Sequence, residues 1–381
     1  MPVFREMTSN ESNRPFSFLV TVLAGASAGL LVRQLLNHRT DYRYTGTVIR
    51  TLLVSLILEP FRWWEIIRWR RKVRKVVISK PPVFVIGFWR SGTTLLHNLL
   101  CCLPDAAYVT TFQTVFPGLL LSGSWWFKPI IGKFWPTHRP FDQVRMGMHL
   151  PQEEEIALAN LQRISFYNFL IFPKDFERFY HRELFFHDID SETKIKWIHK
   201  YKELIRKAMM NTGGDRLISK SPSNMARIPT LLEMFPGARF IFLYRDPYTT
   251  VESFYRFFHE VLPVMQLQDS GNILSRDRMA RVYADMVRQY LDDKYLIPKE
   301  NLVELRYEQF LVNIRQELQE VCQQLGIPGF EEARPQMEKY LNETAGHRKS
   351  GYEIHADTIK YINQYASDIV EFLGYPHRLN E

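Results

Sequence analysis

The sequence has too few cysteines to build a disulfide framework. Its 381 residues include only three, Cys101, Cys102 and Cys322, each in a stretch with apolar, helix-like periodicity. Disulfide-stabilised extracellular domains need several paired cysteines because their cores are small. We therefore expect three buried free thiols in a reducing compartment. Internal repeats and low-complexity tracts are also absent, and 46% hydrophobic with 24% charged residues is the composition of a globular protein with a large core.

Beyond its N-terminal region the chain has no excess of charge of either sign. Residues 1–80 contain 14 basic and 5 acidic residues, a net charge of +9, whereas the whole chain carries +8. Residues 81–381 therefore sum to −1. A nucleic-acid-binding body would need clustered positive charge, so we expect no nucleic-acid partner.

One uncharged run, residues 15–32, reaches the lower limit for a membrane-spanning helix. It leads into arginines and lacks a cleavage site, so it does not resemble a secretory signal. A shorter apolar run at 51–58 precedes interleaved Trp and Arg and a basic cluster at 68–75, a pattern typical of helices in the lipid headgroup region. We predict that residues 1–80 form a membrane-associating helical segment that contacts the bilayer through residues 15–75. Whether 15–32 spans the bilayer or lies in its surface stays open, and a solvated basic helix packed on the body is the alternative.

From residue 81 the sequence alternates short apolar runs with helical patterns. Strands are expected at 81–87, 216–220, 239–244 and 301–307, with helices between them. This alternation predicts an α/β fold of the P-loop type over 81–381, with three layers around a mostly parallel sheet. Residues 112–141, rich in Trp, Phe, Pro and Gly, interrupt the alternation.

The first strand runs into the sequence GFWRSGTT, which begins at Gly87. A glycine-containing turn from a strand into a helix can hold phosphate through backbone N–H groups and the helix N-terminus. Thr93 stands where the Walker A motif has lysine, which disfavours ATP or GTP hydrolysis. Arg90 instead supplies positive charge, and the hydroxyls of Ser91, Thr93 and Thr94 can donate to anionic oxygens.

A second pair of polar residues follows the 239–244 strand. Arg245 leaves the strand end, and Ser253 lies eight residues later on the next helix. This spacing allows both side chains to reach one more phosphate beside the first loop. Taken alone, an Arg–Asp pair that caps the helix at Asp246 is the more common arrangement.

Together the two elements resemble the sulfotransferases that use 3′-phosphoadenosine 5′-phosphosulfate (PAPS), in the bacterial branch related to the tyrosylprotein enzymes. The resemblance covers about residues 81–325 and includes SKSPSNMARI, which contains Lys220. It implies PAPS as co-substrate, no metal, and catalysis by Arg90 and Lys220, with Lys220 neutralising the leaving phosphate oxygen. The implied nucleotide-binding residues are Arg90, Ser91, Gly92, Thr93, Thr94, Arg245, Ser253 and, in a C-terminal flap, Lys349.

The base that deprotonates the acceptor is expected within residues 139–158, which include the acidic block 153–155. Pro151 is a candidate first residue of a helix, which would place the glutamates in its first turns. Glu153 is our first choice and Glu155 our second, with His149 and Asp142 in reserve.

The acceptor is expected to be lipophilic, because residues 118–136 are strongly apolar and aromatic and the N-terminal region suggests a membrane. A sterol, a hydroxylated lipid and a lipid-linked sugar all fit. The arginines after residue 32 favour a body facing the cytoplasm, although sequons at Asn10 and Asn342 leave a lumenal enzyme open. A P-loop kinase or NTPase and a non-catalytic nucleotide-binding scaffold are the alternatives. The oligomeric state stays open, a homodimer included.

Overall fold

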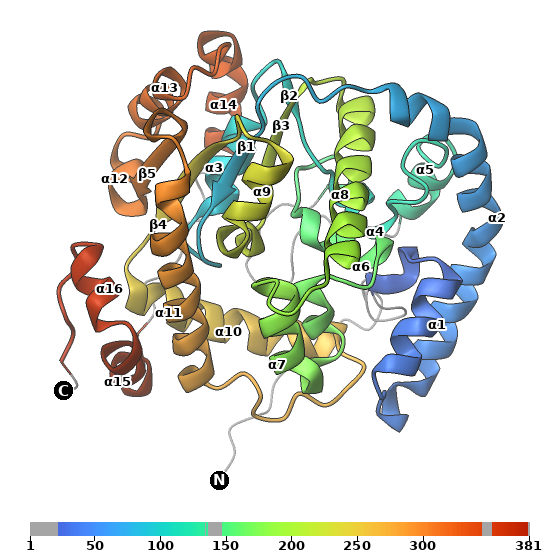
Figure 1. The fold of residues 1–381 in the computed structure, drawn as a ribbon, viewed down its shortest axis with the longest axis horizontal. Coiled ribbons are helices and arrows are strands. Elements are labelled where there is room, and N and C mark those ends of the chain that lie inside the picture. The colour runs from blue at the N-terminus through green and yellow to red at the C-terminus, as the bar shows by residue number, and fades with distance from the viewer. Residues whose placement is uncertain (1–21, 134, 136–146, 345–352, 380–381) are drawn as a thin grey trace.

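A five-stranded parallel sheet forms the centre of the protein (Figure 1). The computed structural model describes residues 22–133, 135, 147–344 and 353–379. The strand order is β2-β3-β1-β4-β5, and every pairing is parallel. The strands are β1 (Val83–Ile86), β2 (Ala106–Ala107), β3 (Arg216–Lys220), β4 (Arg239–Tyr244) and β5 (Leu302–Arg306). This confirms the predicted α/β class with a parallel sheet and adds the short strand β2.

Helices cover both faces of the sheet. In β1 the side chains alternate, so that Val83 and Val85 join the apolar cluster with helices α3 (Thr93–Leu100), α13 (Ile314–Gln324) and α14 (Phe330–Thr344). Phe84 and Ile86 face the opposite way and pack in the larger apolar cluster with helices α8 (Ser191–Thr212), α9 (Ile228–Met234), α10 (Pro247–Met265) and α11 (Arg276–Asp293). Because both faces are buried, the strands are nearly continuous apolar runs. The fold thus has three layers, with the sheet between two layers of helices, as predicted.

The helices of the body vary from 3 to 22 residues in length. In chain order they are α3 (Thr93–Leu100), α4 (Thr111–Val115), α5 (Phe127–Gly132), α6 (Glu154–Leu161), α7 (Phe176–Arg178), α8 (Ser191–Thr212), α9 (Ile228–Met234), α10 (Pro247–Met265), α11 (Arg276–Asp293), α12 (Tyr307–Val312), α13 (Ile314–Gln324), α14 (Phe330–Thr344), α15 (Ala356–Tyr365) and α16 (Ser367–Phe372). Cys101 and Cys322 are buried and Cys102 is half-buried, and all three are free, as expected.

The N-terminal region does not form one helix over the uncharged run. Its described part holds a short 3-10 turn at Val22–Gly25 and then α1 (Ala28–Asn37). Ser27 separates them, because its Oγ accepts a hydrogen bond from the N–H of Leu30 and so begins a new helix. Residues 15–21 lie outside the described residues. Within the described ranges, none of the helices has both the length and the apolar content needed to cross a bilayer.

The longest helix, α2 (Thr45–Lys75), joins the second apolar run and the basic cluster and lies along one edge of the molecule (Figure 1). A buried ion pair attaches it to the body. The Nζ of Lys207 on α8 lies 2.6 Å from Oε1 of Glu65 and also donates to the carbonyl of Pro117. The other Glu65 oxygen accepts hydrogen bonds from the N–H groups of Leu121 and Ser122. These contacts satisfy both charges inside the protein.

Removing one partner of this pair should strongly destabilise the protein. Lys207→Met leaves the Glu65 carboxylate buried and without its cation, which costs about 3–5 kcal/mol of unfolding free energy. Urea unfolding measures the change. The matched control on the same helix is Lys200→Met, because Lys200 forms an exposed pair with Glu203 whose loss should cost about 1 kcal/mol or less. Equal stability changes in the two variants would contradict the proposed role of the buried pair.

Candidate functional site

The loop between β1 and α3 has a backbone that requires glycine at two positions. Gly92 caps α3 with φ of 95°, and a Cβ there would lie 2.2 Å from the Tyr307 ring. Gly87 has φ of 153°, and its Cβ would lie 2.3 Å from the carbonyl oxygen of Leu243. A side chain at either position would clash, so the loop stays close to β4 and to α12. The N-terminus of α3 opens directly beside it.

Three strands end together at this loop. Val85 of β1 pairs with Lys220, the last residue of β3, and Ile86 pairs with Phe242 of β4. The parallel register therefore brings Lys220 and Arg245 to the same edge of the sheet as the glycine loop. The strands that follow β1 in the chain are added on both of its sides, with β3 on one side and β4 on the other, so the end of β1 is a topological switch point. Ligands of open α/β sheets bind at such a switch point.

Both predicted anion-binding elements converge on Arg90. Its Nε donates to the Oγ of Ser253 on α10 at 3.1 Å, and its guanidinium lies over the Phe257 ring. The Nη1 of Arg245 donates to the Arg90 carbonyl at 3.4 Å, with its guanidinium over the Tyr307 ring. Asp246 caps α10 by accepting from the N–H of Tyr248. Asp246 therefore caps α10 while Arg245 still reaches the Arg90 backbone. Arg90, Arg245 and Ser253 form one polar cluster that carries two positive charges.

The conformation of Arg90 is unusual. Its φ is 71°, and such left-handed residues other than glycine cost about 1–3 kcal/mol. The contact with Ser253 holds the side chain in place. Ser91 and Thr93 of the loop are buried, and Thr94 is half-buried in the first turn of α3.

The predicted lysine and the first-choice base form an ion pair. Nζ of Lys220 lies 2.5 Å from Oε1 of Glu153, with Lys220 buried and Glu153 mostly buried. Glu153 caps α6, which begins at Glu154, so the expectation that the helix starts at Pro151 was wrong. Pro151 lies instead in an isolated antiparallel bridge with Thr110. The extended cap conformation directs Glu153 toward the sheet edge.

Sequence reasoning missed two aromatic residues that hold Glu153. The hydroxyl of Tyr167 donates to Oε2 of Glu153, and Nε1 of Trp89 donates to the Tyr167 oxygen at 2.9 Å. Trp89 belongs to the glycine loop itself. The indole, the phenol, the carboxylate and Lys220 thus form a continuous chain of hydrogen bonds. The aromatic residue inside GFWRSGTT was the available signal for Trp89, whereas nothing in the sequence places Tyr167 beside Glu153.

The other candidate bases are arranged differently. Glu155 is buried in a structural network, where its Oε2 lies 2.6 Å from Nη1 of Arg227 and its Oε1 accepts from Ser165 Oγ and from the N–H of Phe166. His149 is exposed in a turn. Asp142 and Lys349 lie outside the described residues.

Two further titratable groups lie near Lys220. His97 is buried on α3 and contacts the carbonyl of Ile218, and burial with the nearby Lys220 charge lowers its pKa to about 3. Glu154 is fully buried, and burial raises its pKa to about 7. His97 is therefore uncharged near neutral pH, whereas Glu154 is protonated below about pH 7 and loses its proton above it.

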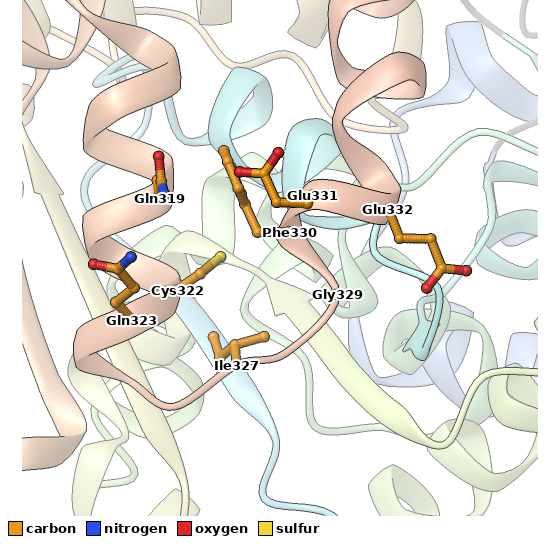
Figure 2. Close-up of a pocket in the computed structure, with 8 residues that line it drawn as sticks. All are labelled: Gln319, Cys322, Gln323, Ile327, Gly329, Phe330, Glu331 and Glu332. Carbon is orange, nitrogen blue, oxygen red and sulfur yellow. The ribbon is translucent and has the colours of Figure 1, made fainter.

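A separate cavity of about 290 Å³ opens between α13 and the start of α14. Figure 2 shows Gln319, Cys322 and Gln323 on one side of it and Phe330 on the other. None of its lining residues belongs to the glycine loop, β3 or β4. Across the described ranges, no group of three or more His, Cys, Asp or Glu residues is arranged to hold a metal ion.

Comparison with known proteins identifies the family. Residues 81–332 match the model of the sulfotransferase family, which is well over half of the chain. This chain belongs to the sulfotransferase family. The match confirms the resemblance given by the glycine loop and the Arg245–Ser253 pair, and with it the enzyme class.

Mycobacterial sulfotransferases are among the similar proteins. The chain is 28% identical over 348 residues to omega-hydroxy-beta-dihydromenaquinone-9 sulfotransferase Stf3 of Mycobacterium bovis, covering 89% of this chain and 86% of that protein. The crystal structure of sulfotransferase STF9 from Mycobacterium avium has a TM-score of 0.66 at 15% identity, covering 92% of this chain and 97% of that one. Sulfotransferase STF1 from Mycobacterium tuberculosis H37Rv has a TM-score of 0.59 at 14% identity, covering 89% and 90%. The two crystal structures share the fold.

Glu154 should make stability pH-dependent. Burial raises the pKa of its carboxyl to about 7, so the folded state binds this proton more tightly than the unfolded state does. The contribution of this group is therefore greatest below its ordinary pKa and is lost as the pH rises to about 7. The slope reaches at most about 1.4 kcal/mol per pH unit.

The test compares urea unfolding of the native protein and Glu154→Gln between pH 5 and pH 8. The variant keeps the shape of the side chain and cannot ionise, so its unfolding free energy should fall less across this interval. Parallel curves for the two proteins would show that Glu154 is not protonated in the folded state.

Proposed function

We propose that this sulfotransferase moves a sulfuryl group from PAPS to a hydroxyl of a lipophilic acceptor at a membrane surface. The observation that carries the proposal is the Lys220–Glu153 pair, placed at the sheet edge where the glycine loop and Arg245 also lie. A cation and a carboxylate side by side are the two groups that sulfuryl transfer to an alcohol requires.

Glu153 is the general base in this proposal. Its carboxylate takes the proton of the acceptor hydroxyl while the new O–S bond forms and the S–O bond to the nucleotide phosphate breaks. Lys220 neutralises the charge that develops on the leaving oxygen. Tyr167 and Trp89 are positioning residues, because they hold Glu153 through its second oxygen. Glu155 is a poorer candidate, since both of its oxygens are engaged by buried donors.

The nucleotide is held by the polar cluster around Arg90. Ser91, Gly92, Thr93 and Thr94 offer N–H groups and hydroxyls at the start of α3 for the 5′-phosphosulfate. In this proposal Arg245 and Ser253 bind the 3′-phosphate. Arg90, which contacts both of these residues, contributes to nucleotide binding and stabilises the charge on the transferring sulfuryl group. Lys349 is proposed to add a cation from the C-terminal flap.

The acceptor class rests on the relative and on the surroundings of Glu153. Stf3, by its name, sulfates an omega-hydroxylated dihydromenaquinone, which is a long lipid. In this chain an apolar cluster of Phe112, Phe116, Leu119 and Phe127 connects α2 with α4, and α4 lies against α6, which Glu153 caps. A hydroxylated lipid or quinone fits such an environment better than a polar metabolite. The membrane-associating role of the N-terminal segment and a cytoplasm-facing body belong to the same proposal.

Sulfate transfer from labelled PAPS to hydroxylated isoprenoid quinones in mixed micelles tests the proposal. Glu153→Gln should lower kcat at least 100-fold with little change in affinity for 3′-phosphoadenosine 5′-phosphate (PAP), because the base acts only in the chemical step. Lys220→Ala should also reduce transfer far more than PAP binding.

The control for these variants is Lys200→Ala on the exposed face of α8, which should retain full activity. Wild-type levels of transfer in Glu153→Gln would rule out Glu153 as the base. Equal losses of transfer and PAP affinity in Lys220→Ala would make Lys220 a binding residue.

Arg245→Ala should selectively weaken recognition of the 3′-phosphate. Since the guanidinium forms a charge-assisted contact with that group, PAP affinity should fall about 10- to 100-fold while AMP affinity changes little. Isothermal titration calorimetry with both nucleotides measures the difference. Equal weakening for PAP and AMP would place Arg245 elsewhere on the nucleotide.

A further inference from the structure

The polarity of α2 is inverted relative to a helix of a water-soluble protein. Over residues 51–67 it turns mostly polar side chains toward the protein, because its buried positions are Thr51, Ser55, Leu58, Arg62 and Glu65. Ser55 donates to the carbonyl of Ala26, and Arg62 donates to the carbonyl of Ala24 and to the Glu59 carboxylate. Glu65 pairs with Lys207. The charges of this segment are thus satisfied on its inner side.

The outer side of the same segment is entirely apolar. Every exposed residue between 51 and 67 is an aliphatic, aromatic or proline residue, namely Leu53, Leu56, Ile57, Pro60, Phe61, Trp63, Trp64, Ile66 and Ile67. Several are more than half exposed, with Ile57 at 66% and Ile67 at 74%. A surface helix normally has the reverse arrangement, with polar residues facing water. A continuous apolar face of this length indicates a non-aqueous neighbour.

A second segment extends this apolar face. The ring of Trp126 lies 4.5 Å from that of Phe61, which brings the residues before α5 against α2. The adjacent Trp125 is 79% exposed, and Ile130 of α5 is also exposed. Two separate parts of the chain therefore present large apolar side chains on one edge of the molecule.

Positive charge follows this face directly. The last two turns of α2 carry six exposed basic residues, Arg68, Arg70, Arg71, Lys72, Arg74 and Lys75. They lie in sequence after Trp63 and Trp64, so aromatic and cationic groups adjoin. Aromatic side chains at the headgroup level and clustered Lys and Arg beside them are the features of proteins that bind anionic bilayers.

We propose that the outer face of α2, together with Trp125 and Ile130, is a membrane-binding surface that lies in the headgroup region of an anionic bilayer. The helix lies in the plane of the membrane and does not cross it. This inference deepens the proposed function by naming its lipid-contacting surface, and its test does not depend on sulfate transfer.

The attachment of α2 to the body fixes how the protein faces the bilayer. Glu65 joins α2 to α8 and to the 121–122 backbone, so the apolar face cannot turn without breaking a buried ion pair. Leu58, on the inner side of α2, belongs to the apolar cluster with Phe112 and Phe116 of α4. The face that meets lipid is thereby joined, through packed apolar side chains, to α4, which lies against the helix that Glu153 caps.

Co-sedimentation with vesicles tests the surface. Full-length protein is mixed with vesicles of phosphatidylcholine alone or with 30% phosphatidylglycerol, in about 0.1 M salt. The native protein should bind the anionic vesicles, and Ile57→Glu/Ile67→Glu should reduce the partition coefficient at least tenfold. Arg70→Gln/Arg71→Gln should remove most of the preference for anionic over neutral vesicles.

The matched control is Val312→Glu/Leu296→Glu. Both side chains are exposed apolar residues, and α12, which carries Val312, lies on the opposite side of the molecule from α2 (Figure 1). This variant should bind vesicles like the native protein. Thermal stabilisation by PAP is measured for all variants and should be unchanged, which separates a fault in folding or in the nucleotide site from loss of lipid binding.

Native protein that stays in solution with both kinds of vesicle would overturn the proposal. A native dimer that Ile57→Glu/Ile67→Glu converts to a monomer, without vesicle binding by either, would show that a second copy of the chain covers this face. Vesicle binding that the Val312→Glu/Leu296→Glu control loses equally would also contradict it.

Discussion

The parallel register of β3, β1 and β4 is the constraint on which the site depends. Because parallel strands end at one edge, the register places Lys220, the glycine loop and Arg245 together, although more than 150 residues separate the first and last of them in the chain. Each strand supplies one polar group at its end, and the sheet supplies their spacing. The rigid sheet, and not the loops, therefore fixes the relative positions of these groups.

Buried charge pairs connect this edge to the rest of the protein. Lys220 pairs with Glu153, Arg227 with Glu155 and Lys207 with Glu65, and each pair joins segments distant in sequence. A buried charge is costly without its partner, so each pair fixes the position of two elements. The Lys220–Glu153 pair satisfies both charges within the protein, and Tyr167 and Trp89 beside it hold the carboxylate in place.

Sequence patterns located β1, β3, β4 and β5, because central parallel strands are short apolar runs between turns. They also singled out Arg90, Arg245 and Ser253, which the structure brings into contact, and the family resemblance singled out Lys220, which lies at the same edge of the sheet. The binding and catalytic roles of these four residues stay predictions. They missed the two-residue strand β2, which has no periodicity to detect. The distinction between Glu153 and Glu155 depends on Arg227 and Tyr167, whose proximity only tertiary structure reveals. The sequence likewise does not show which side of α2 faces the body, so its apolar outer side becomes visible only in the tertiary structure.

The most direct test of the account is binding of PAP to the purified protein, with ATP–magnesium in parallel, followed by thermal unfolding. A ligand that binds the native state raises its apparent stability in proportion to occupancy. The account predicts an increase in Tm with PAP and none with ATP–magnesium, because Thr93 replaces the lysine that reaches the β- and γ-phosphates and because Arg245 and Ser253 are proposed to bind the 3′-phosphate. Stabilisation by ATP–magnesium and not by PAP would contradict it.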